Sequence, residues 1–295
     1  MERNDKVGFD VRSTPNKGVG VFATRHFAPG DLIINDSCLI SSRGCEKGST
    51  EERGQWEKRL KFHLKSSVDN LSSAEDRQNY LCLRDRCEFK YSDEAVELGI
   101  LQEYGLPLGQ NSEHFGFFPN ACMVNHSCRP SGNHVFNPET GNEEIRAVTQ
   151  ILPGDEITVC YINNACFAKT TSERRNEIGE RFGFTCRCCA CESSDPGSER
   201  RRAEIAGLLR DIPRMRPETA LFAFQAVMQV LDEEGFVVAK GPLAEQALQI
   251  ALENFKYDEA LTWAEFALKQ FIIAFGEASE PAMKLKNVIK ELGCH

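Results

Sequence analysis

Four cysteines lie within six residues of this chain, in the segment Cys186-Arg187-Cys188-Cys189-Ala190-Cys191. Tetrahedral zinc accepts four thiolates at about 2.3 Å, and closely spaced cysteines can wrap around one ion. Cys186, Cys188 and Cys191 form a C-x-C-x-x-C pattern, whereas the Cys189 side chain is expected to leave on another side. The alternative is disulfide exchange between adjacent thiols, which a reducing compartment disfavours. The segment therefore predicts zinc bound by three local thiolates, with a fourth ligand from elsewhere in the chain.

Length and composition restrict the classes of protein to which the chain can belong. Its 295 residues can bury a sizeable core, and 41% hydrophobic with 27% charged residues are ordinary for a globular protein. No apolar run reaches the roughly 18 to 20 residues of a membrane-spanning helix, and the polar start lacks a signal-peptide core. The net charge of −9 disfavours loose binding to nucleic acid. We expect a monomeric intracellular protein, cytoplasmic or nuclear, without membrane or direct nucleic-acid contacts, whose 13 cysteines are free thiols or metal ligands.

Two stretches, residues 7–40 and 115–161, carry the alternating apolar pattern of β-strands. In the first of them Val19, Val21 and Ala23 alternate with their neighbours. Turns rich in Gly, Pro, Asn and Asp interrupt both stretches, at residues 14–18, 28–31, 137–141 and 151–156. Short strands joined by such turns indicate a meander and not a series of βαβ units.

Two other parts of the chain, an insertion and the C-terminal part, have helical patterns. Apolar residues recur at helical spacing in 55–68 and 74–88, which predicts a helical insertion over about 41–110 that begins with a polar loop. After a polar linker at 192–198, the chain is predicted to be helical to its end. One hairpin there resembles a tetratricopeptide unit, without an established repeat array. We therefore predict an α+β fold with two domains, residues 7–192 and 199–295.

Three further segments carry chemically useful residues, although each has an ordinary explanation when it is taken alone. Asn125-His126-Ser127-Cys128-Arg129-Pro130 could be a turn with a structural histidine and a buried thiol. The segment from Gly154 to Tyr161 fits equally well a turn and a strand that ends in tyrosine. The glycine pair of Lys17-Gly18-Val19-Gly20 permits close backbone approach to a ligand, but it also fits a hairpin. None of the three identifies a function by itself.

Taken together in their order and spacing, the four segments resemble the SET-domain methyltransferases, especially the fungal relatives of the SET-and-MYND family. The resemblance covers residues 7–192, and its most specific parts are N-H-S-C-x-P and C-x-C-x-x-C. It implies a β-rich SET domain with a pseudoknot, a helical insertion, a post-SET motif at 182–191 and a C-terminal helical domain. No MYND finger is visible in the insertion, so the partner-binding role of that finger is not carried over. Ser131 also departs from the family pattern, which usually has Asn after the Pro.

The resemblance implies a role for each matching residue. It assigns Cys128 as the fourth ligand of one structural zinc ion, beside Cys186, Cys188 and Cys191. Tyr161 is the implied catalytic residue, and Phe182 and Phe184 are the implied walls of the channel for the acceptor amine. The cofactor implied is S-adenosylmethionine, and the residues that would contact it are Lys17, Gly18, Val19, Gly20, Asn125, His126, Tyr161 and Phe184.

The implied reaction is transfer of a methyl group to the neutral amine of a protein or peptide lysine. In-line positioning in a narrow channel can supply up to roughly 7 to 11 kcal/mol of barrier reduction. Desolvation beside a cationic cofactor lowers the pKa of the acceptor ammonium. Because Phe182 and Phe184 have no hydroxyl that could hold the amine, we expect the channel to admit a second or third methyl group. Two other functions compete: methylation of a small-molecule amine, and a non-catalytic SET-fold scaffold or binding protein.

Overall fold

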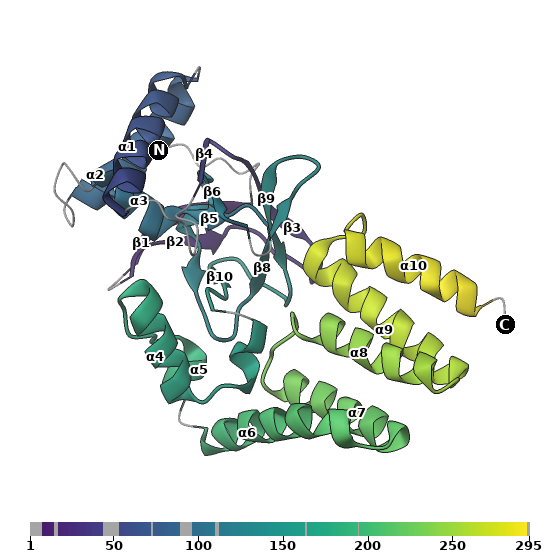
Figure 1. Ribbon diagram of the computed structural model, residues 1–295. Coiled ribbons are helices and arrows are strands. Elements are labelled where there is room, and N and C mark those ends of the chain that lie inside the picture. The colour runs from purple at the N-terminus through teal and green to yellow at the C-terminus, as the bar shows by residue number, and fades with distance from the viewer. Residues whose placement is uncertain are drawn as a thin grey trace.

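The computed structural model describes residues 8–14, 17–43, 53–71, 73–88, 96–109, 112–162, 164–193 and 195–293. Short strands gather in the centre, the helices of the insertion lie at one end, and the C-terminal helices run along the opposite side (Figure 1). This segregation of sheets and helices is the α+β architecture that the sequence predicted. Pro15 and Asn16, in the first predicted turn, lie outside the described residues.

The first sheet joins strands that are far apart in the sequence, in the order β1-β2-β10-β7. β1 (Phe9–Thr14) and β2 (Gly18–Ala23) form an antiparallel hairpin. β10 (Glu156–Val159) pairs antiparallel with β2 and parallel with β7 (Asn125–His126). Val21 and Ala23 of β2 are fully buried, as expected for alternate residues on one face of a strand. The sheet thus brings three of the motif segments side by side.

Two antiparallel sheets complete the β structure of the described residues. One has the order β3-β9-β8, with β3 (Leu32–Ser37), β9 (Asn142–Ala147) and β8 (Gly132–Asn137). The other has the order β4-β6-β5, with β4 (Ile40–Arg43), β6 (His114–Phe117) and β5 (Leu106–Pro107). The predicted loop therefore begins later than residue 41, because Ser41, Ser42 and Arg43 pair with β6. A partner strand more than seventy residues away overrides the polar composition of this segment.

Between β4 and β5 lie three helices, α1 (Arg53–Asp69), α2 (Ala74–Glu88) and α3 (Val96–Tyr104). The first two confirm the helices predicted at 55–68 and 74–88. The third was not predicted, since its nine residues are too few to show a clear period. Leu64 of α1, Leu83 of α2 and Ile100 of α3 are fully buried in one apolar cluster with residues of the sheets. This packing attaches the insertion to the β core.

The segment after β10 contains η2 (Asn164–Ala168), α4 (Thr171–Phe182) and α5 (Cys189–Glu192). A capping box starts α4: the Thr170 hydroxyl accepts from the Glu173 backbone N–H, and the Glu173 carboxylate accepts from the Thr170 backbone N–H. Gly183 ends the helix with a φ of +73°, a left-handed conformation that favours glycine. These two signals fix where Phe182 and the following cysteines lie.

The C-terminal part consists of α6 (Pro196–Asp211), α7 (Pro217–Glu233), α8 (Lys240–Glu253), α9 (Tyr257–Phe275) and α10 (Glu280–Leu292), with the short η3 (Ile212–Arg214) after α6. The predicted linker at 192–198 is shorter than expected, because the Asp195 carboxylate accepts from the Gly197 N–H at 2.8 Å and α6 begins at Pro196. The N-cap of α9 is Lys256. None of the helices described has both the length and the apolar character required to cross a membrane.

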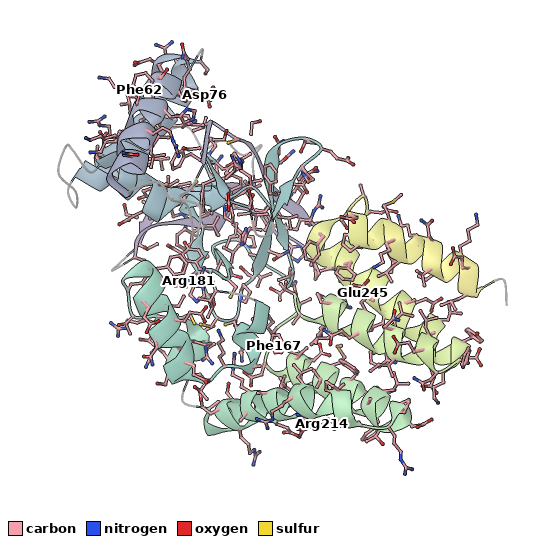
Figure 2. The ribbon with its side chains drawn as sticks, in the orientation of Figure 1. Phe62, Asp76, Phe167, Arg181, Arg214 and Glu245 are labelled. Carbon is pink, nitrogen blue, oxygen red and sulfur yellow. The ribbon has the colours of Figure 1, made fainter. Side chains whose placement is uncertain are left out.

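The C-terminal helices share a buried core with the segments around the cysteines. Their apolar faces belong to one cluster together with Cys128, Cys186, Cys188 and Cys191. Phe167 of η2 lies near the middle of the molecule (Figure 2), and its ring centroid is 5.5 Å from that of Phe236, which follows α7. On the opposite side, the Asn133 side chain in β8 donates to the Ala274 carbonyl of α9 at 2.9 Å. Helix α9 is thereby packed directly onto the β3-β9-β8 sheet.

Candidate active site and metal site

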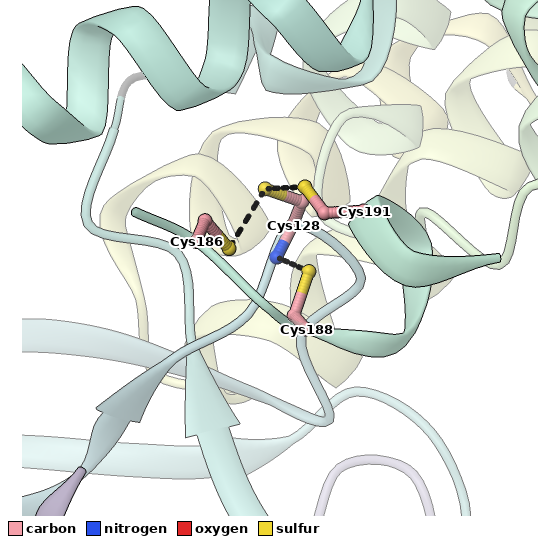
Figure 3. Close-up of side chains that lie close together, drawn as sticks. All are labelled: Cys128, Cys186, Cys188 and Cys191. Carbon is pink, nitrogen blue, oxygen red and sulfur yellow. Dashed lines mark hydrogen bonds between the residues drawn. The ribbon is translucent and has the colours of Figure 1, made fainter. Parts of the chain in front are cut away.

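The four cysteines predicted as zinc ligands meet in one buried cluster (Figure 3). All four sulfur atoms lie within 4.8 Å of one another. The Cys128 sulfur is 3.6 Å from that of Cys191 and 3.9 Å from that of Cys186. A tetrahedral ion with bonds of about 2.3 Å separates its sulfur ligands by about 3.8 Å, so the cluster has the dimensions of a four-thiolate metal site. Cys189, in contrast, is exposed.

A buried arginine indicates that this cluster carries negative charge. Arg174 of α4 has no exposed surface, and within the described chain it donates to two backbone carbonyls, to the Thr171 hydroxyl and, at 3.7 Å, to the Cys191 sulfur. Burial by itself opposes the charged form, but the charges of Cys191 and Cys128 raise the pKa of Arg174. A buried guanidinium without a carboxylate partner needs another anion. Thiolates supply that anion, and metal binding is what ionises a group of thiols. The donor set therefore fits a metal ion.

The same helix also holds the backbone of the cysteine segment. The Arg175 guanidinium donates to the carbonyl of Cys186 at 3.1 Å and to that of Cys191 at 3.0 Å. The Cys128 backbone N–H donates to the Cys188 sulfur at 3.3 Å. Hydrogen bonds with Cys128 and Cys186 lower the pKa of Cys191 to about 7. These contacts hold the backbone of the cysteine segment in place, and the hydrogen bonds among the sulfur atoms favour the ionised form at Cys188 and Cys191 while they raise the pKa of Cys186.

His126 connects the cysteine cluster to Tyr161. Its Nδ1 accepts from the Tyr161 backbone N–H at 3.0 Å, and its Nε2 lies 3.2 Å from the Cys128 sulfur. Burial lowers the pKa of His126 to about 4, so the ring is neutral at neutral pH. Because Nδ1 accepts, the single ring proton is on Nε2 and is donated to the sulfur. The positions of Tyr161 and of the cluster are thus linked through one imidazole.

Tyr161 lies between two aromatic rings and is held at its hydroxyl. Its O–H donates to the Val124 carbonyl at 2.7 Å, and its ring centroid is 5.3 Å from that of His126 and 5.2 Å from that of Phe182. Burial raises the pKa of Tyr161, so the phenol stays protonated. Phe182 keeps 38% of its surface exposed. The structure therefore brings the predicted catalytic residue and one predicted channel residue into contact.

Phe184, the second predicted channel residue, has no ring contact with Tyr161 among those described. It follows the left-handed Gly183 and is 41% exposed. The structure therefore does not bring the Phe184 ring into contact with Tyr161 among the ring contacts described.

Lys17 and the start of β2, residues 18–20, are fixed to Asn125 by a carboxylate that sequence reasoning did not select. The Asn125 side chain donates to the Val19 carbonyl and to the Glu156 carboxylate, both at 2.8 Å. The Lys17 ammonium donates to the other Glu156 oxygen at 2.9 Å. A Cβ atom on Gly20 would lie 2.8 Å from this carboxylate, so a side chain there would displace Glu156 from its position beside Asn125. Glu156 belongs to a quoted motif, but nothing in the sequence shows that it contacts both segments.

Comparisons with known proteins find similarity to lysine methyltransferases. The family model described as "SET domain" matches residues 18–162. Histone-lysine N-methyltransferase set5 of Schizosaccharomyces pombe is 26% identical over 297 residues, which cover 97% of this chain and 85% of that protein. Histone-lysine N-methyltransferase SMYD3 of Mus musculus is 33% identical over 28% of this chain, and N-lysine methyltransferase SMYD2 of Rattus norvegicus is 33% identical over 32%. The matches span only 18% and 21% of those two relatives.

Proposed function

Because the chain carries a SET domain at residues 18–162, we propose that it is an S-adenosylmethionine-dependent methyltransferase that modifies the side-chain amine of a protein lysine. One observation carries this proposal: Tyr161, the Asn125-His126 pair and residues 17–20 converge from three distant segments, because β10 pairs with β7 on one side and with β2 on the other. The similarity to set5 over nearly the whole chain, a relative named as a histone-lysine methyltransferase, supports the protein lysine as acceptor.

The residues that would hold the cofactor are 17–20, Asn125, His126, Tyr161 and Phe184. S-Adenosylmethionine supplies a methyl group activated by its sulfonium charge. Gly18 has open space on its side-chain side, where a ligand could approach the backbone, and Glu156 keeps Lys17 and Asn125 in fixed positions beside it. The exposed ring of Phe184 is free to pack against the adenine.

The acceptor amine would enter beside Tyr161 and Phe182. The Tyr161 hydroxyl donates to Val124, so its lone pairs remain available for weak C–H···O contacts with the methyl group. An aromatic, partly desolvated channel lowers the pKa of the acceptor ammonium, which must lose its proton before it can attack. The Arg181 guanidinium already lies over the Phe182 ring, 5.3 Å from its centroid, so a methylated ammonium would be attracted by the Tyr161 ring instead. Positioning and deprotonation of the amine are therefore the tasks of this chain's own side chains.

For the metal site we propose one structural zinc ion bound by Cys128, Cys186, Cys188 and Cys191. The sulfur–sulfur distances and the buried charge of Arg174 support four thiolates around a divalent ion. Zinc would tie the post-SET segment at 182–191 to the loop that carries His126. Elemental analysis of the purified protein should return about one zinc ion per chain.

The same proposal includes the domain boundaries, the oligomeric state, the cellular location and the partner of the protein. Residues 7–192 would form the catalytic domain and residues 199–295 a helical domain, in a monomer that acts in the cytoplasm or the nucleus. The partner is a protein or peptide lysine, with a small-molecule amine as the alternative acceptor and no direct binding to nucleic acid.

Calorimetric titration with S-adenosylmethionine tests the proposal first, and a wild-type protein without binding would refute it in favour of a scaffold. Peptides and amine metabolites incubated with labelled methyl donor then separate the two kinds of acceptor. Tyr161→Phe should bind the cofactor with nearly unchanged affinity but lose about 100-fold or more of the transfer rate, because a preorganised hydroxyl is removed from the reacting centre. Tyr257→Phe on α9 is the matched control and should transfer methyl groups normally. Unchanged turnover in Tyr161→Phe would contradict the role of that hydroxyl.

A further inference from the structure

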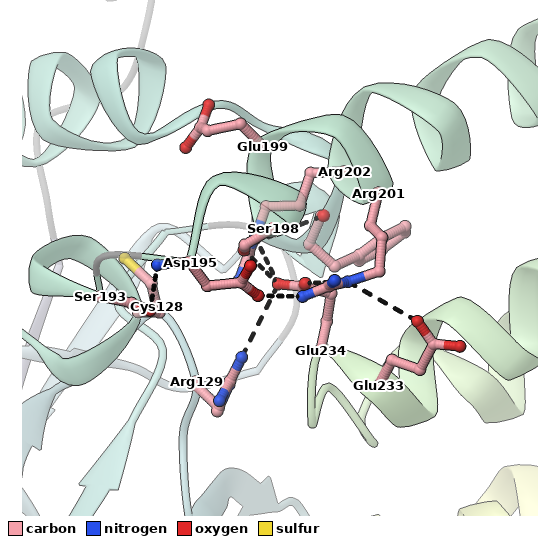
Figure 4. Close-up of polar contacts among 12 residues, drawn as sticks. Cys128, Arg129, Ser193, Asp195, Ser198, Glu199, Arg201, Arg202, Glu233 and Glu234 are labelled. Atoms are coloured by element: carbon pink, nitrogen blue, oxygen red, sulfur yellow. Dashed lines mark hydrogen bonds and ion pairs between the residues drawn. The ribbon is translucent and has the colours of Figure 1, made fainter.

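A buried carboxylate joins the C-terminal helices to the segment that carries Cys128 (Figure 4). Glu234 follows the end of α7, and its side chain has no exposed surface. It accepts hydrogen bonds from the Ser198 hydroxyl at 2.7 Å, from Arg201 at 2.8 Å and from Arg202 at 2.9 Å. Arg129, the residue after Cys128, places a guanidinium nitrogen 3.8 Å from the same carboxylate. One carboxylate thus meets two arginines of α6 and one arginine of the metal-site segment.

Glu234 is charged. Among the described residues, it is the acid that lies within ion-pair distance of both Arg129 and Arg202. Burial opposes its ionisation, but hydrogen bonds from Ser198 and Arg201 and the charge of Arg202 lower its pKa. The neighbouring acids Asp195 and Glu233 form their ion pairs with Arg201. Arg202 is itself fully buried, so a charged Glu234 is needed to compensate it. The carboxylate is therefore held firmly by α6 and presents a fixed negative charge to Arg129.

The Arg129 side chain is positioned by the charge of Glu234 and also by contact with the backbone of Gly235. Gly235 has a φ of +65°, and a Cβ atom there would lie 3.1 Å from the Arg129 Cδ, so the arginine stem runs across the glycine. On the other side, the Ser127 hydroxyl donates to the Arg129 carbonyl at 2.9 Å and accepts from the Arg129 N–H at 3.1 Å. Fixing Arg129 therefore fixes Ser127 and Cys128, which directly follow His126.

We propose that Glu234, acting through Arg129, positions the segment Asn125–Cys128, so that the C-terminal helices are required for metal retention and cofactor binding by the SET domain. Glu234 touches none of the residues assigned to the cofactor or the acceptor, and it is a positioning residue. The proposal rests on the proposed function for what this segment binds. The coupling between α7 and the segment can be measured without any catalytic activity.

Arg129→Met in the full-length, zinc-loaded chain is the decisive variant, because it keeps the stem over Gly235 and removes the charge. Arg201→Met is its matched control, since it also removes a partner of Glu234 but leaves the metal-site segment untouched. Hydrogen–deuterium exchange of residues 125–131 and zinc release to a chromogenic chelator are the measurements. We expect about tenfold or greater acceleration of both in Arg129→Met, and changes of less than about threefold in Arg201→Met. Wild-type rates in Arg129→Met, or equal acceleration in both variants, would overturn the proposal.

Glu234→Gln completes a double-mutant cycle with Arg129→Met. If Glu234 acts through Arg129, the fold-change in zinc release caused by Glu234→Gln is much smaller in the Arg129→Met background than in the wild-type background. Fold-changes that simply multiply would show independent effects and would refute the coupling. The cofactor Kd, measured by calorimetry, should follow the same pattern. If the wild-type chain does not bind S-adenosylmethionine, the proposed function fails, while exchange and zinc release still decide whether Glu234 positions the segment.

Discussion

Replacing Arg174 by methionine tests whether the cysteine cluster is an anionic metal site. The guanidinium is fully buried, and the thiolates are the only anions to which its described contacts connect it. Removing one partner of a buried charge pair typically costs about 3 to 5 kcal/mol, because the other charge stays buried without compensation. At about 1.4 kcal/mol for each factor of ten, zinc affinity should fall by more than about 100-fold. Methionine preserves the apolar volume of the stem, so the loss reports on charge and hydrogen bonds.

Arg175→Met is the matched control, because Arg175 is half-buried on the same helix and donates to two backbone carbonyls of the cysteine segment. We expect the free energy of zinc binding to weaken by about 1 to 2 kcal/mol in this variant, which is the usual range for the loss of two such hydrogen bonds. Zinc affinity is measured by competition with a chromogenic chelator at neutral pH. Equal losses in the two variants, or an Arg174→Met protein that binds zinc within tenfold of wild type, would refute the reasoning that thiolates compensate Arg174.

Three further predictions concern the active site and the buried acid. Glu156→Gln places a donor nitrogen opposite the Lys17 ammonium or the Asn125 amide, both of which are donors. The Kd for S-adenosylmethionine, measured by calorimetry, should therefore rise about tenfold. An unchanged Kd would show that this carboxylate does not organise the cofactor site. The wild-type protein should yield di- or trimethyl product in intact-mass analysis. Phe182→Tyr should shift the product toward the monomethyl form, because the added hydroxyl can hold the amine. Monomethyl product alone from the wild type would contradict this prediction. The pKa of Glu234 is lowered from its ordinary value of 4.5, so its contribution to the free energy of unfolding is complete above that value and is lost as the pH falls through the lower, folded-state pKa. The difference in urea midpoint between wild type and Glu234→Gln should therefore shrink at acidic pH. A difference that does not change with pH would contradict the stabilising role of the charged Glu234 carboxylate.

Local patterns predicted most of the secondary structure where the periodicity was long or the turn chemistry strong. The helices at 55–68 and 74–88 and the strands around Val21 are examples, because side-chain period is a property of neighbouring residues. β4 and the nine-residue α3 were missed. β4 has a polar composition and exists because β6 offers hydrogen-bond partners to it, which no local pattern contains.

At the site, sequence reasoning identified the residues that form motifs and missed those that hold them. Tyr161, His126 and the four cysteines belong to dense, specific segments, and the structure brings them together. Glu156, Arg174 and Glu234 are ordinary charged residues in the sequence, where such residues are usually on the surface. Only their burial and their partners distinguish them.

The sequence by itself determined the α+β class, the motif segments and the presence of enough thiols for one metal site, because these depend on residue type, spacing and period. The tertiary structure decided that Cys128 meets Cys186 and Cys191 across 58 and 63 positions of the chain, and that one neutral histidine links them to Tyr161. It also decided which charges are buried, at Arg174 beside the thiolates and at Glu234 beneath Arg129. The physical reason is that the cost of a buried charge and the identity of its partner depend on the packing of distant segments, which no local pattern specifies.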